Sequence, residues 1–454
     1  MQWNWVDPQT AERGQSLLRR LTDQGHEGYF VGGCVRDELL GRPVNDMDIA
    51  TNATPEQVIA LFERTIPTGL EHGTITVLIE NEPFEVTTYR TETEYVDHRR
   101  PEQVQFVREL SEDLRRRDFT MNAIARGIDG EYVDPFQGIK DLGNGIIRCV
   151  GVADERFEED ALRMVRGIRF ASVFKFEIEQ QTWQALLHHQ ALIKHIATER
   201  IRIEMEKMIA GSYPYDGIEL LLRSGLIPYM KVDVPCEKLN LDLLRSLESL
   251  PSSPSVLRWT LIALALGMDE LQIKQYFKAW TFPNTITDQV SKIIRMHQRL
   301  YDGLVAEDAT SSPISEQQSI HSNIIDPQIN HDSLANNELD QHYVAFVSCV
   351  LDYGKEIAQH WQTLYHVLPE HDQQRLFTIG DQADTWLQQL TVYTLADLPI
   401  KGQEVLQHVQ IPAGKWLGEL LNEILLLVST GQLANNKEVI LDYANQASAR
   451  KGLR

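Results

Sequence analysis

The feature that most restricts the fold is a change in hydrophobic periodicity near residue 150. Before it, short runs of alternating or β-branched residues lie between turns, at residues 29–31, 46–50, 74–80 and 84–89. Such runs are typical of strands, and the last two read as a hairpin. After it, apolar residues recur at helical spacing over residues 155–172, 180–189 and 198–210. The sequence predicts an α+β fold: a small mixed α/β head with an antiparallel-type sheet, followed by an all-helical remainder.

The length of the chain, 454 residues, leaves room for two to four domains. A stretch at 305–340 is rich in Ser, Asn, Asp and Gln and has few large apolar residues, which predicts a flexible insertion or long loop. We therefore expect five segments along the chain: a head at 1–148, a helical neck at 149–212, a helical body at 213–304, the insertion at 305–340 and a helical tail at 341–454.

Several features indicate a cytoplasmic protein without membrane contact. The four cysteines lie far apart and form no CxxC pair, so neither a disulfide framework nor a zinc site is expected. The first ten residues, MQWNWVDPQT, lack the basic start and apolar core of a signal peptide. The most apolar run, at residues 424–428, is far too short to cross a bilayer.

The formal net charge of -22 argues, taken alone, against nucleic acid as a partner, because phosphate contacts need Lys and Arg. The basic residues are unevenly placed, however, and no Lys or Arg occurs between Arg299 and Lys355. A local basic track is therefore possible on an acidic protein, and net charge does not decide the question. Its members would be Arg99, Arg100, Arg115, Arg116, Arg117, Arg163, Arg166, Arg169, Arg200, Arg202 and Lys207.

Asp46 and Asp48 are candidate metal ligands. In a strand, side chains two residues apart point to one face, so the two carboxylates would lie side by side. Close carboxylates repel each other unless a cation lies between them, and Mg²⁺ prefers such oxygen ligands. Two such ions can activate an attacking hydroxyl and stabilise a leaving pyrophosphate. A lone DxD also occurs by chance in solvated loops.

The segment upstream strengthens this hypothesis. The sequence GGCVRD, residues 32–37, stands between a predicted strand and a predicted helix. Gly32 and Gly33 would let the backbone approach a triphosphate closely, and Arg36 would add a charge-assisted contact. A plain strand-to-helix turn would also explain the two glycines.

Seven motifs occur in one order: GGCVRD, DMDIAT, HGTITV, FEVTTYR, RRRDFTMNA, DPFQGIKDL and EEDALRMVRGIRF. Together they resemble the bacterial class II CCA-adding enzymes of the polymerase-β nucleotidyltransferase superfamily, over about residues 14–210, with a weaker similarity at 400–435. The resemblance implies template-independent addition of C, C and A to the 3′ end of tRNA from CTP and ATP, with release of pyrophosphate. It also implies two Mg²⁺ ions on the catalytic residues Asp46 and Asp48. No obligate protein partner is evident.

The resemblance assigns base selection to the EDxxR motif at residues 159–163, and the chemistry supports this independently. Asp160 only accepts hydrogen bonds and Arg163 only donates them, and on a helix the two would share a face. Cytosine and adenine both present an amino donor beside a ring-nitrogen acceptor, whereas guanine and uracil present the reverse. Such a site can reject the wrong base by roughly 10⁴-fold. The alternative is a surface salt bridge between the two residues, worth roughly 0.3 kcal/mol.

The resemblance extends to further residues. Arg116 and Arg117 would contact the triphosphate, Asp118 would bind ribose or position its neighbours, and Arg166 would support the motif or contact the base. The full set expected to bind nucleotide is Gly32, Gly33, Arg36, Arg116, Arg117, Asp118, Asn122, Asp160, Arg163, Arg166 and Arg169, and the set expected to bind RNA is Arg200, Arg202 and Lys207.

Other parts of the chain match elements of the family. Residues 92–113 would be the flexible loop that accompanies A addition, and 134–142 a hinge element. Glu85 is either a third carboxylate near the metals or a strand residue with a structural partner.

Three alternative functions stay open. A poly(A) polymerase on the same fold would typically carry a basic GRRFRL-like stretch, which the sequence lacks. Among partial enzymes, a CC-adding form is disfavoured by the loop at 92–113, but an A-adding form is not. A catalytically inactive RNA-binding protein would have no need of Asp46, Asp48, Asp160 and Arg163 together.

Overall fold

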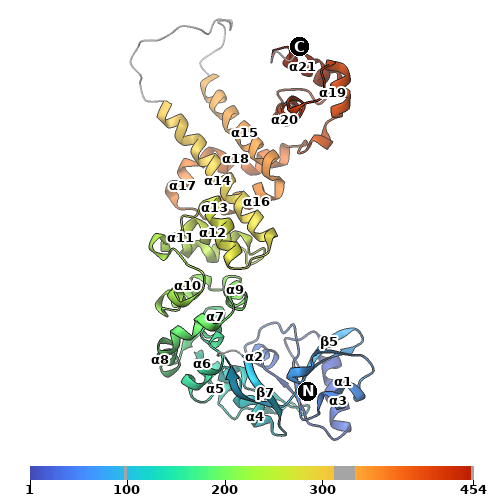
Figure 1. The fold of residues 1–454 in the computed structure, drawn as a ribbon, viewed down its shortest axis with the longest axis vertical. Helices are drawn as coiled ribbons and strands as arrows, with labels where there is room; N and C mark the ends of the chain where they lie inside the picture. Colours follow the sequence, from blue (N-terminus) through green and yellow to red (C-terminus); the bar gives the residue numbers. More distant parts are fainter. Residues whose placement is uncertain (97–99, 311–332, 451–454) are drawn as a thin grey trace. The chain divides into compact units, whose positions relative to one another are not determined.

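The computed structural model describes the backbone of residues 1–96, 100–310 and 333–450, with the side chains outside 92–104 and 305–340. It divides into two compact units, Met1–Pro235 and Cys236–Arg454 (Figure 1). The first unit holds all of the strands in the described part of the chain, and the second is helical. The expected α+β division is confirmed.

A seven-stranded sheet forms the centre of the head, in the order β3-β4-β5-β2-β1-β8-β9. Its strands are β1 (Gly28–Val31), β2 (Ile49–Thr51), β3 (Thr65–Gly69), β4 (Thr74–Ile79), β5 (Glu82–Thr88), β8 (Ala125–Arg126) and β9 (Tyr132–Val133). The expected hairpin is β4–β5, but β2 pairs with β5 in parallel, so the sheet is mixed. The expectation of an antiparallel-type sheet was wrong at this pair. In the sequence, helix α3 (Pro55–Leu61) and strands β3 and β4 lie between β2 and β5. This connection is long enough for the crossover that two parallel strands need.

Helix α1 (Pro8–Asp23) covers one side of strand β1. Asp7 caps the helix by accepting hydrogen bonds from the backbone N–H groups of Gln9 and Thr10, and Pro8 fits the first helical position. Its apolar stripe includes the fully buried Leu18 and Leu21, whose side chains lie close to Gly28. The start of β1 is thus held against α1, and α2 (Gly33–Leu39) begins two residues after the strand ends at Val31.

The Asp46–Asp48 segment precedes its strand, because β2 begins only at Ile49. The expected strand at 46–50 is therefore shorter, but the side-chain alternation holds across it. Met47 and Ile49 are buried, Asp46 is exposed and Asp48 is half-buried. The two carboxylates thus lie on the side opposite the core.

A hairpin occupies much of the expected loop at 92–113. Strands β6 (Arg90–Val96) and β7 (Arg100–Phe106) pair in antiparallel fashion, and helix α4 (Leu110–Arg115) follows. Residues 97–99 lie outside the described residues. The expectation of a loop was wrong for the backbone of these two strands, because six residues of each strand are paired with residues of the other.

The segment expected as the neck, 149–212, holds four α-helices after α5 (Gly138–Asn144): α6 (Ala153–Glu159), α7 (Leu162–Phe174), α8 (Gln180–His189) and α9 (Thr198–Ile209). Helix α10 (Pro214–Arg223) follows at the start of the expected body. Helices α9 and α10 both pack on α7. The short strands β10 (Ile146–Ile147) and β11 (Glu177–Ile178) pair in parallel beside it.

The single helix expected at 155–172 is instead two helices, broken at Asp160. This residue has extended backbone angles, φ −140° and ψ 103°, between α6 and α7. Its carboxylate accepts a hydrogen bond from the N–H of Leu162 at 3.0 Å. Asp160 therefore satisfies a free donor at the start of α7, which explains the break.

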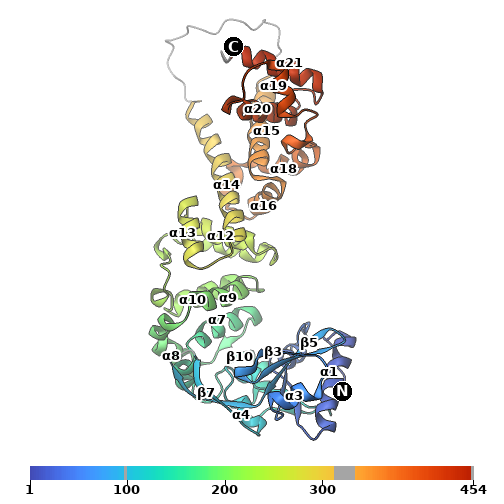
Figure 2. The ribbon, with the colours of Figure 1, turned by 45° about the vertical axis from the view of Figure 1, so that its right-hand side comes forward.

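The second unit consists of helices (Figure 2), and their buried side chains are mostly apolar. They are α11 (Leu241–Leu244), α12 (Val256–Ala265), α13 (Glu270–Ala279), α14 (Asn284–Thr310), α15 (Ser333–Tyr353), α16 (Lys355–Tyr365), α17 (Glu370–Arg375), α18 (Phe377–Gln389), α19 (Gly402–Val409), α20 (Lys415–Ser429) and α21 (Lys437–Arg450). Val405, Ile424 and Ile440 join the last three around one core.

Helices α14 and α15 extend into both ends of the segment expected as an insertion, 305–340. Residues 311–332 lie outside the described residues. Over the part of the chain that is described, no helix is both long and apolar enough to span a bilayer.

Candidate active site

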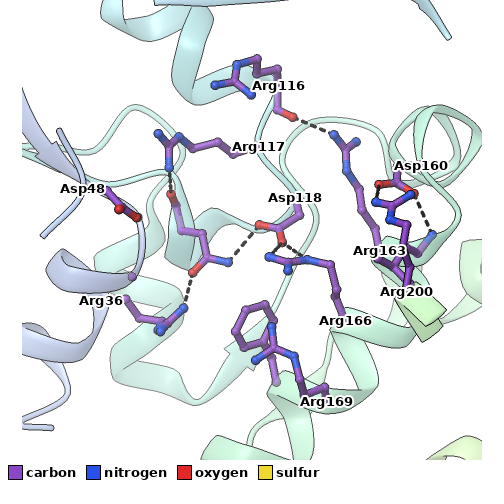
Figure 3. A pocket seen from close by; sticks show the side chains of 15 residues that line it. Arg36, Asp48, Arg116, Arg117, Asp118, Asp160, Arg163, Arg166, Arg169 and Arg200 are labelled. Carbon is purple, nitrogen blue, oxygen red and sulfur yellow. Dashed lines mark hydrogen bonds and ion pairs between the residues drawn. The ribbon is translucent and has the colours of Figure 1, made fainter. Parts of the chain in front are cut away.

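The first unit contains a cavity of about 540 Å³, and every residue expected to bind nucleotide lines it (Figure 3). The lining also includes Asp48, which was expected to bind metal, and Arg200, which was expected to bind RNA. Leu162 and Phe170 complete it, and neither was singled out in the sequence. The cavity thus lies between four parts of the unit: the end of β1, the segment before β2, residues 116–118 (the RRD segment) and the helices of the neck.

Gly32 ends β1 in a backbone conformation that only glycine adopts easily. Its φ is +72° and its ψ is −125°. A Cβ atom at this position would lie 3.0 Å from Nη1 of Arg117. Glycine therefore lets a cationic side chain lie directly against the backbone at the floor of the cavity.

Three carboxylates gather at the other edge of the site. Burial, then the nearby charges of Glu85 and Asp46, raise the pKa of Asp48 to about 6, although Arg117 opposes the shift. Glu85 directly precedes Val86 on β5, and Asp48 directly precedes Ile49 of β2. Val86 and Ile49 are paired in parallel, so Glu85 and Asp48 stand at corresponding positions of neighbouring strands. The mutual repulsion of these groups is the chemistry that a bound divalent cation would relieve.

A carboxylate that sequence analysis missed holds the two consecutive arginines of the RRD segment. Asp113 on α4 is only 1% exposed, and its two oxygens accept from Arg116 at 2.7 Å and from Arg117 at 3.2 Å. Burial alone would raise the pKa of Asp113, but the two guanidinium groups outweigh it and lower the pKa. The i,i+3 and i,i+4 spacing on a helix could have identified this residue.

Asp118 uses its whole carboxylate within the protein. One oxygen accepts from the N–H of Phe119 at 2.8 Å and from the amide of Asn122 at 2.9 Å. The other accepts from Nε and Nη2 of Arg166 at 2.9 and 2.7 Å. A carboxylate has about four acceptor positions, so none is left for a ribose hydroxyl. Of its two expected roles, the structure favours positioning.

These contacts continue across the cavity to Arg36. Asn122 accepts from Nη1 of Arg36 at 2.7 Å, and the guanidinium lies over the ring of Phe170 at 5.2 Å. Burial would raise the pKa of Asp118, but Arg166 and Asn122 more than compensate and hold it below its usual range. A chain of hydrogen bonds thus runs from α2 to α7 and fixes two arginines that face the cavity.

A second missed carboxylate lies behind α7. Glu204 on α9 is 4% exposed, and it lies 2.5 Å from Nε of Arg169 and 3.5 Å from Nη1 of Arg166. Arg169 also lies 3.8 Å above the ring of Phe170. Burial lowers the pKa of Arg169 to about 10, so it stays charged at neutral pH. A glutamate in an amphipathic helix carries no sequence signal that it is buried.

Asp160 and Arg163, the pair expected to recognise the base, line the cavity, and no ion pair joins them among the described contacts (Figure 3). Asp160 is bound to Arg200 at 2.8 Å, and Arg163 to Glu159 at 2.5 Å. The expectation that the pair shares one helix face was wrong, because Asp160 precedes α7. The alternative of a salt bridge between them is equally wrong, since each has a different ionic partner.

The residues expected to bind RNA are divided between two environments. Arg200 faces the cavity, while Arg202 is bound to Glu206 at 2.5 Å on the same helix. Lys207 has a side chain that is 57% exposed and lies 4.0 Å from Glu204. Asp46, in contrast to Asp48, does not line the cavity and is exposed beside it.

Comparison with known proteins extends this picture along the whole chain. Residues 28–148 match the model of the "Poly A polymerase head domain", residues 175–232 that of the "Probable RNA and SrmB- binding site of polymerase A" and residues 329–444 that of the "tRNA nucleotidyltransferase domain 2". The three matches follow one another from the head to the tail.

Relatives of similar length carry one name. The CCA-adding enzymes of Lactiplantibacillus plantarum and Enterococcus faecalis are each 36% identical to this chain, with 98% of both chains covered. The crystal structure of the Bacillus stearothermophilus CCA-adding enzyme in complex with CTP has a TM-score of 0.76 and 31% identity, covering 98% of this chain and 99% of that one. This protein therefore belongs to the family of CCA-adding enzymes.

Proposed function

We infer that this protein is an ATP(CTP):tRNA nucleotidyltransferase, which adds C, C and A to the 3′ end of tRNA without a nucleic acid template. CTP and ATP are the substrates and pyrophosphate is released. The observation that carries the proposal is the single cavity in which arginines, an acidic edge and the base-recognising pair meet. A relative with 31% identity was solved with CTP, which agrees with this use of the cavity.

The acidic edge suits magnesium. Asp46 and Asp48 would hold the ions, two in the proposed reaction, with Glu85 beside them as a candidate third carboxylate. When bound, Mg²⁺ would lower the pKa of the attacking 3′-hydroxyl and neutralise the charge of the leaving pyrophosphate. The raised pKa of Asp48 is consistent with this assignment, because its causes are burial first and then the charges of Glu85 and Asp46, and a bound cation would favour the charged carboxylate against both.

The basic part of the cavity suits a triphosphate. Arg36, Arg116 and Arg117 approach it from α2 and from the end of α4, and each is held by a neighbouring carboxylate or amide. Gly32 leaves the backbone open beside Arg117. Arginines that are already oriented lose little conformational entropy when the phosphates bind, which favours a fixed position for the α-phosphate.

Selection of the base follows from the two directions of hydrogen bonding. The carboxylate of Asp160 would accept from the exocyclic amino group of cytosine or adenine, while Arg163 donates to the neighbouring ring nitrogen. Guanine and uracil would place a carbonyl against the carboxylate and an N–H against the guanidinium. Leaving charged groups unpaired in this way costs several kcal/mol, so both bases are refused.

We further propose the head at 1–148 as the catalytic part, the neck at 149–212 as the nucleotide-selecting part, the body at 213–304 as a helical connection and the tail at 341–454 as the tRNA-binding part. Binding of tRNA would depend on shape and phosphate contacts. We place the reaction in the cytoplasm, where the four free cysteines stay reduced.

One assay tests the proposal against its rivals. The protein is incubated with tRNA transcripts that end in the discriminator base, in C or in CC, together with each labelled nucleoside triphosphate. We expect C on the first two transcripts, A only on the third, and no addition afterwards. Long A tracts would indicate a poly(A) polymerase, addition of A alone an A-adding enzyme, and no addition at all an inactive RNA-binding protein.

The same assay tests base selection with variants. Arg163→Ala and Asp160→Ala are each expected to lose roughly 1–3 kcal/mol of discrimination against UTP and GTP. Arg156→Ala is the matched control for Arg163, because Arg156 also binds Glu159, at 2.5 Å, but does not line the cavity. A uniform loss of rate with unchanged selectivity in both Asp160→Ala and Arg163→Ala would refute the templating role.

A further inference from the structure

We propose that Arg200 is the positioning residue that fixes the carboxylate of Asp160 in its base-recognising orientation, and thereby sets the discrimination between C or A and U or G. The inference rests on the proposed function and deepens it. It moves Arg200 from the set expected to bind RNA to the nucleotide-selecting machinery.

Asp160 needs such a partner because its own backbone does not restrain it. The residue stands between α6 and α7 in an extended conformation, so no helix turn limits its side-chain rotamers. Two donors hold the carboxylate instead. The N–H of Leu162 binds Oδ1 at 3.0 Å, and Nη2 of Arg200 binds Oδ2 at 2.8 Å. The first contact fixes one oxygen, and only the second fixes the plane of the group.

Arg200 leaves room for a base while it holds the carboxylate. Each carboxylate oxygen offers about two acceptor positions, and the strong contacts of Leu162 and Arg200 take one position on each oxygen. Nη1 of Arg200 lies a further 3.5 Å from Oδ1. A position therefore stays available for the exocyclic amino group of cytosine or adenine. Figure 3 shows Arg200 and Asp160 side by side at the cavity.

The two members of the base-recognising pair are positioned independently. Arg163 donates to Glu159 and to the backbone carbonyl groups of Arg156 and Arg116. Asp160 is held from α9, 40 residues further along the chain. Loss of Arg200 should therefore release the acceptor and leave the donor in place.

The location of Arg200 argues against a simple phosphate contact. Its guanidinium already binds a carboxylate inside the cavity, and its side chain is only 30% exposed. Lys207, on the same helix, is far more exposed and is the better candidate for a phosphate of RNA. A released Asp160 carboxylate could rotate or admit water, and a carbonyl of uracil or guanine would then meet a weaker penalty.

The test is the selectivity of Arg200 variants. Arg200→Gln removes the charge, Arg200→Met keeps the aliphatic length, and Arg200→Lys keeps the charge without the planar fork. The matched control is Arg13→Gln, because Arg13 also bridges distant elements of this unit, through Glu80 and Glu82, but lies outside the cavity. The kcat/KM of CTP, UTP, ATP and GTP is measured for each variant, together with tRNA affinity at several salt concentrations.

We expect the CTP-over-UTP and ATP-over-GTP ratios to fall about 10- to 100-fold in Arg200→Gln and Arg200→Met. Arg200→Lys should fall less, and Arg13→Gln should not change. Arg200→Gln added to Asp160→Asn should lower the ratios no further, because the residue acts through Asp160. The use of two uncharged variants and a double variant keeps the result independent of any one variant folding poorly.

Unchanged ratios in Arg200→Gln and Arg200→Met, with weaker tRNA binding and a smaller salt dependence, would overturn the inference and make Arg200 a phosphate contact. Unchanged ratios with unchanged tRNA binding would overturn it as well. Failure of the wild-type protein to add C and A to tRNA would instead refute the proposed function, so the two failures are distinguishable.

Discussion

Nε and Nη2 of Arg166 both donate to one oxygen of Asp118, at 2.9 and 2.7 Å, and so join the RRD segment to helix α7. The remaining oxygen of Asp118 is occupied by Asn122 and by a backbone N–H. The pair is partly buried, with side-chain exposures of 10% for Asp118 and 31% for Arg166. One ionic contact therefore sets the distance between the proposed triphosphate-binding and base-selecting parts of the cavity.

The first prediction concerns this contact. Asp118→Asn should lower kcat/KM at least tenfold for all four nucleoside triphosphates, without changing their ratios, because it displaces Arg166 and Asn122 together. The free energy of unfolding should fall by about 3 kcal/mol, as for other broken buried ion pairs. Comparison of CTP with dCTP is the decisive measurement. A selective loss of ribose discrimination would show that Asp118 contacts the sugar.

The second prediction concerns Asp113 and pH. The folded-state pKa of Asp113 is lowered, so its contribution to stability is present above the unfolded value of about 4 and is lost as the pH falls below it. Asp113→Asn should therefore lower the free energy of unfolding by about 3 kcal/mol at pH 7 and by clearly less at pH 3, below the unfolded value. Urea denaturation at both pH values measures the difference. An equal loss at both would mean that charge pairing is not the cause.

The third prediction concerns the acidic edge of the site. Asp46→Asn and Asp48→Asn should each abolish nucleotide transfer while tRNA affinity stays within a few-fold, because the carboxylates serve the reaction and not the nucleic acid. Glu85→Gln should show a partial loss that added Mg²⁺ restores, since Glu85 is proposed as a neighbour of the ions and Asp46 and Asp48 as their ligands. Asp129→Asn, an exposed carboxylate of the same unit, is the control. Substantial turnover by either aspartate variant would refute the metal assignment.

Much of this site follows from the sequence because its motifs are local. The turn after the first strand points to Gly32, Gly33 and Arg36, and the resemblance of RRRDFTMNA to the family implies Arg116, Arg117, Asp118 and Asn122. The structure brings these seven residues together in one cavity. The mixed sheet could not be predicted in the same way, since the parallel pairing of β2 with β5 depends on a crossover of three intervening elements.

The contacts that the sequence did not reveal have a common cause. They join residues that are distant in sequence, or they come from a helix whose sequence looks like that of any amphipathic helix. Glu204 was missed, and Arg200 was expected to bind RNA and not Asp160; both lie on α9, whose amphipathic pattern does not reveal that this face meets α7. The break at Asp160 was also hidden, because its neighbours favour a helix and only the capping contact with Leu162 ends it. Tertiary contacts here override local propensity.

The fourth prediction compares two adjacent glycines. Gly32→Ala should destabilise the protein by roughly 1–3 kcal/mol and reduce nucleotide affinity, because an L-residue is strained at this positive φ and its Cβ would meet Arg117 at 3.0 Å. Gly33→Ala should keep the stability of the wild type, since its nearest neighbour, a flexible arginine end, is 3.7 Å away. Thermal unfolding and CTP titration separate the two. Equal stability of both variants would contradict the argument from backbone strain.

All residues that line the cavity lie between Gly32 and Arg200, within the unit that ends at Pro235. We therefore expect the choice of nucleotide to be determined by residues 32–200, less than half of the chain. We expect the helices after Pro235 to influence which RNA ends are bound. Substitutions after Pro235 should accordingly alter which RNA ends are extended, while the added sequence stays the same. Chimaeras joined near this residue should add the nucleotides that the N-terminal parent adds.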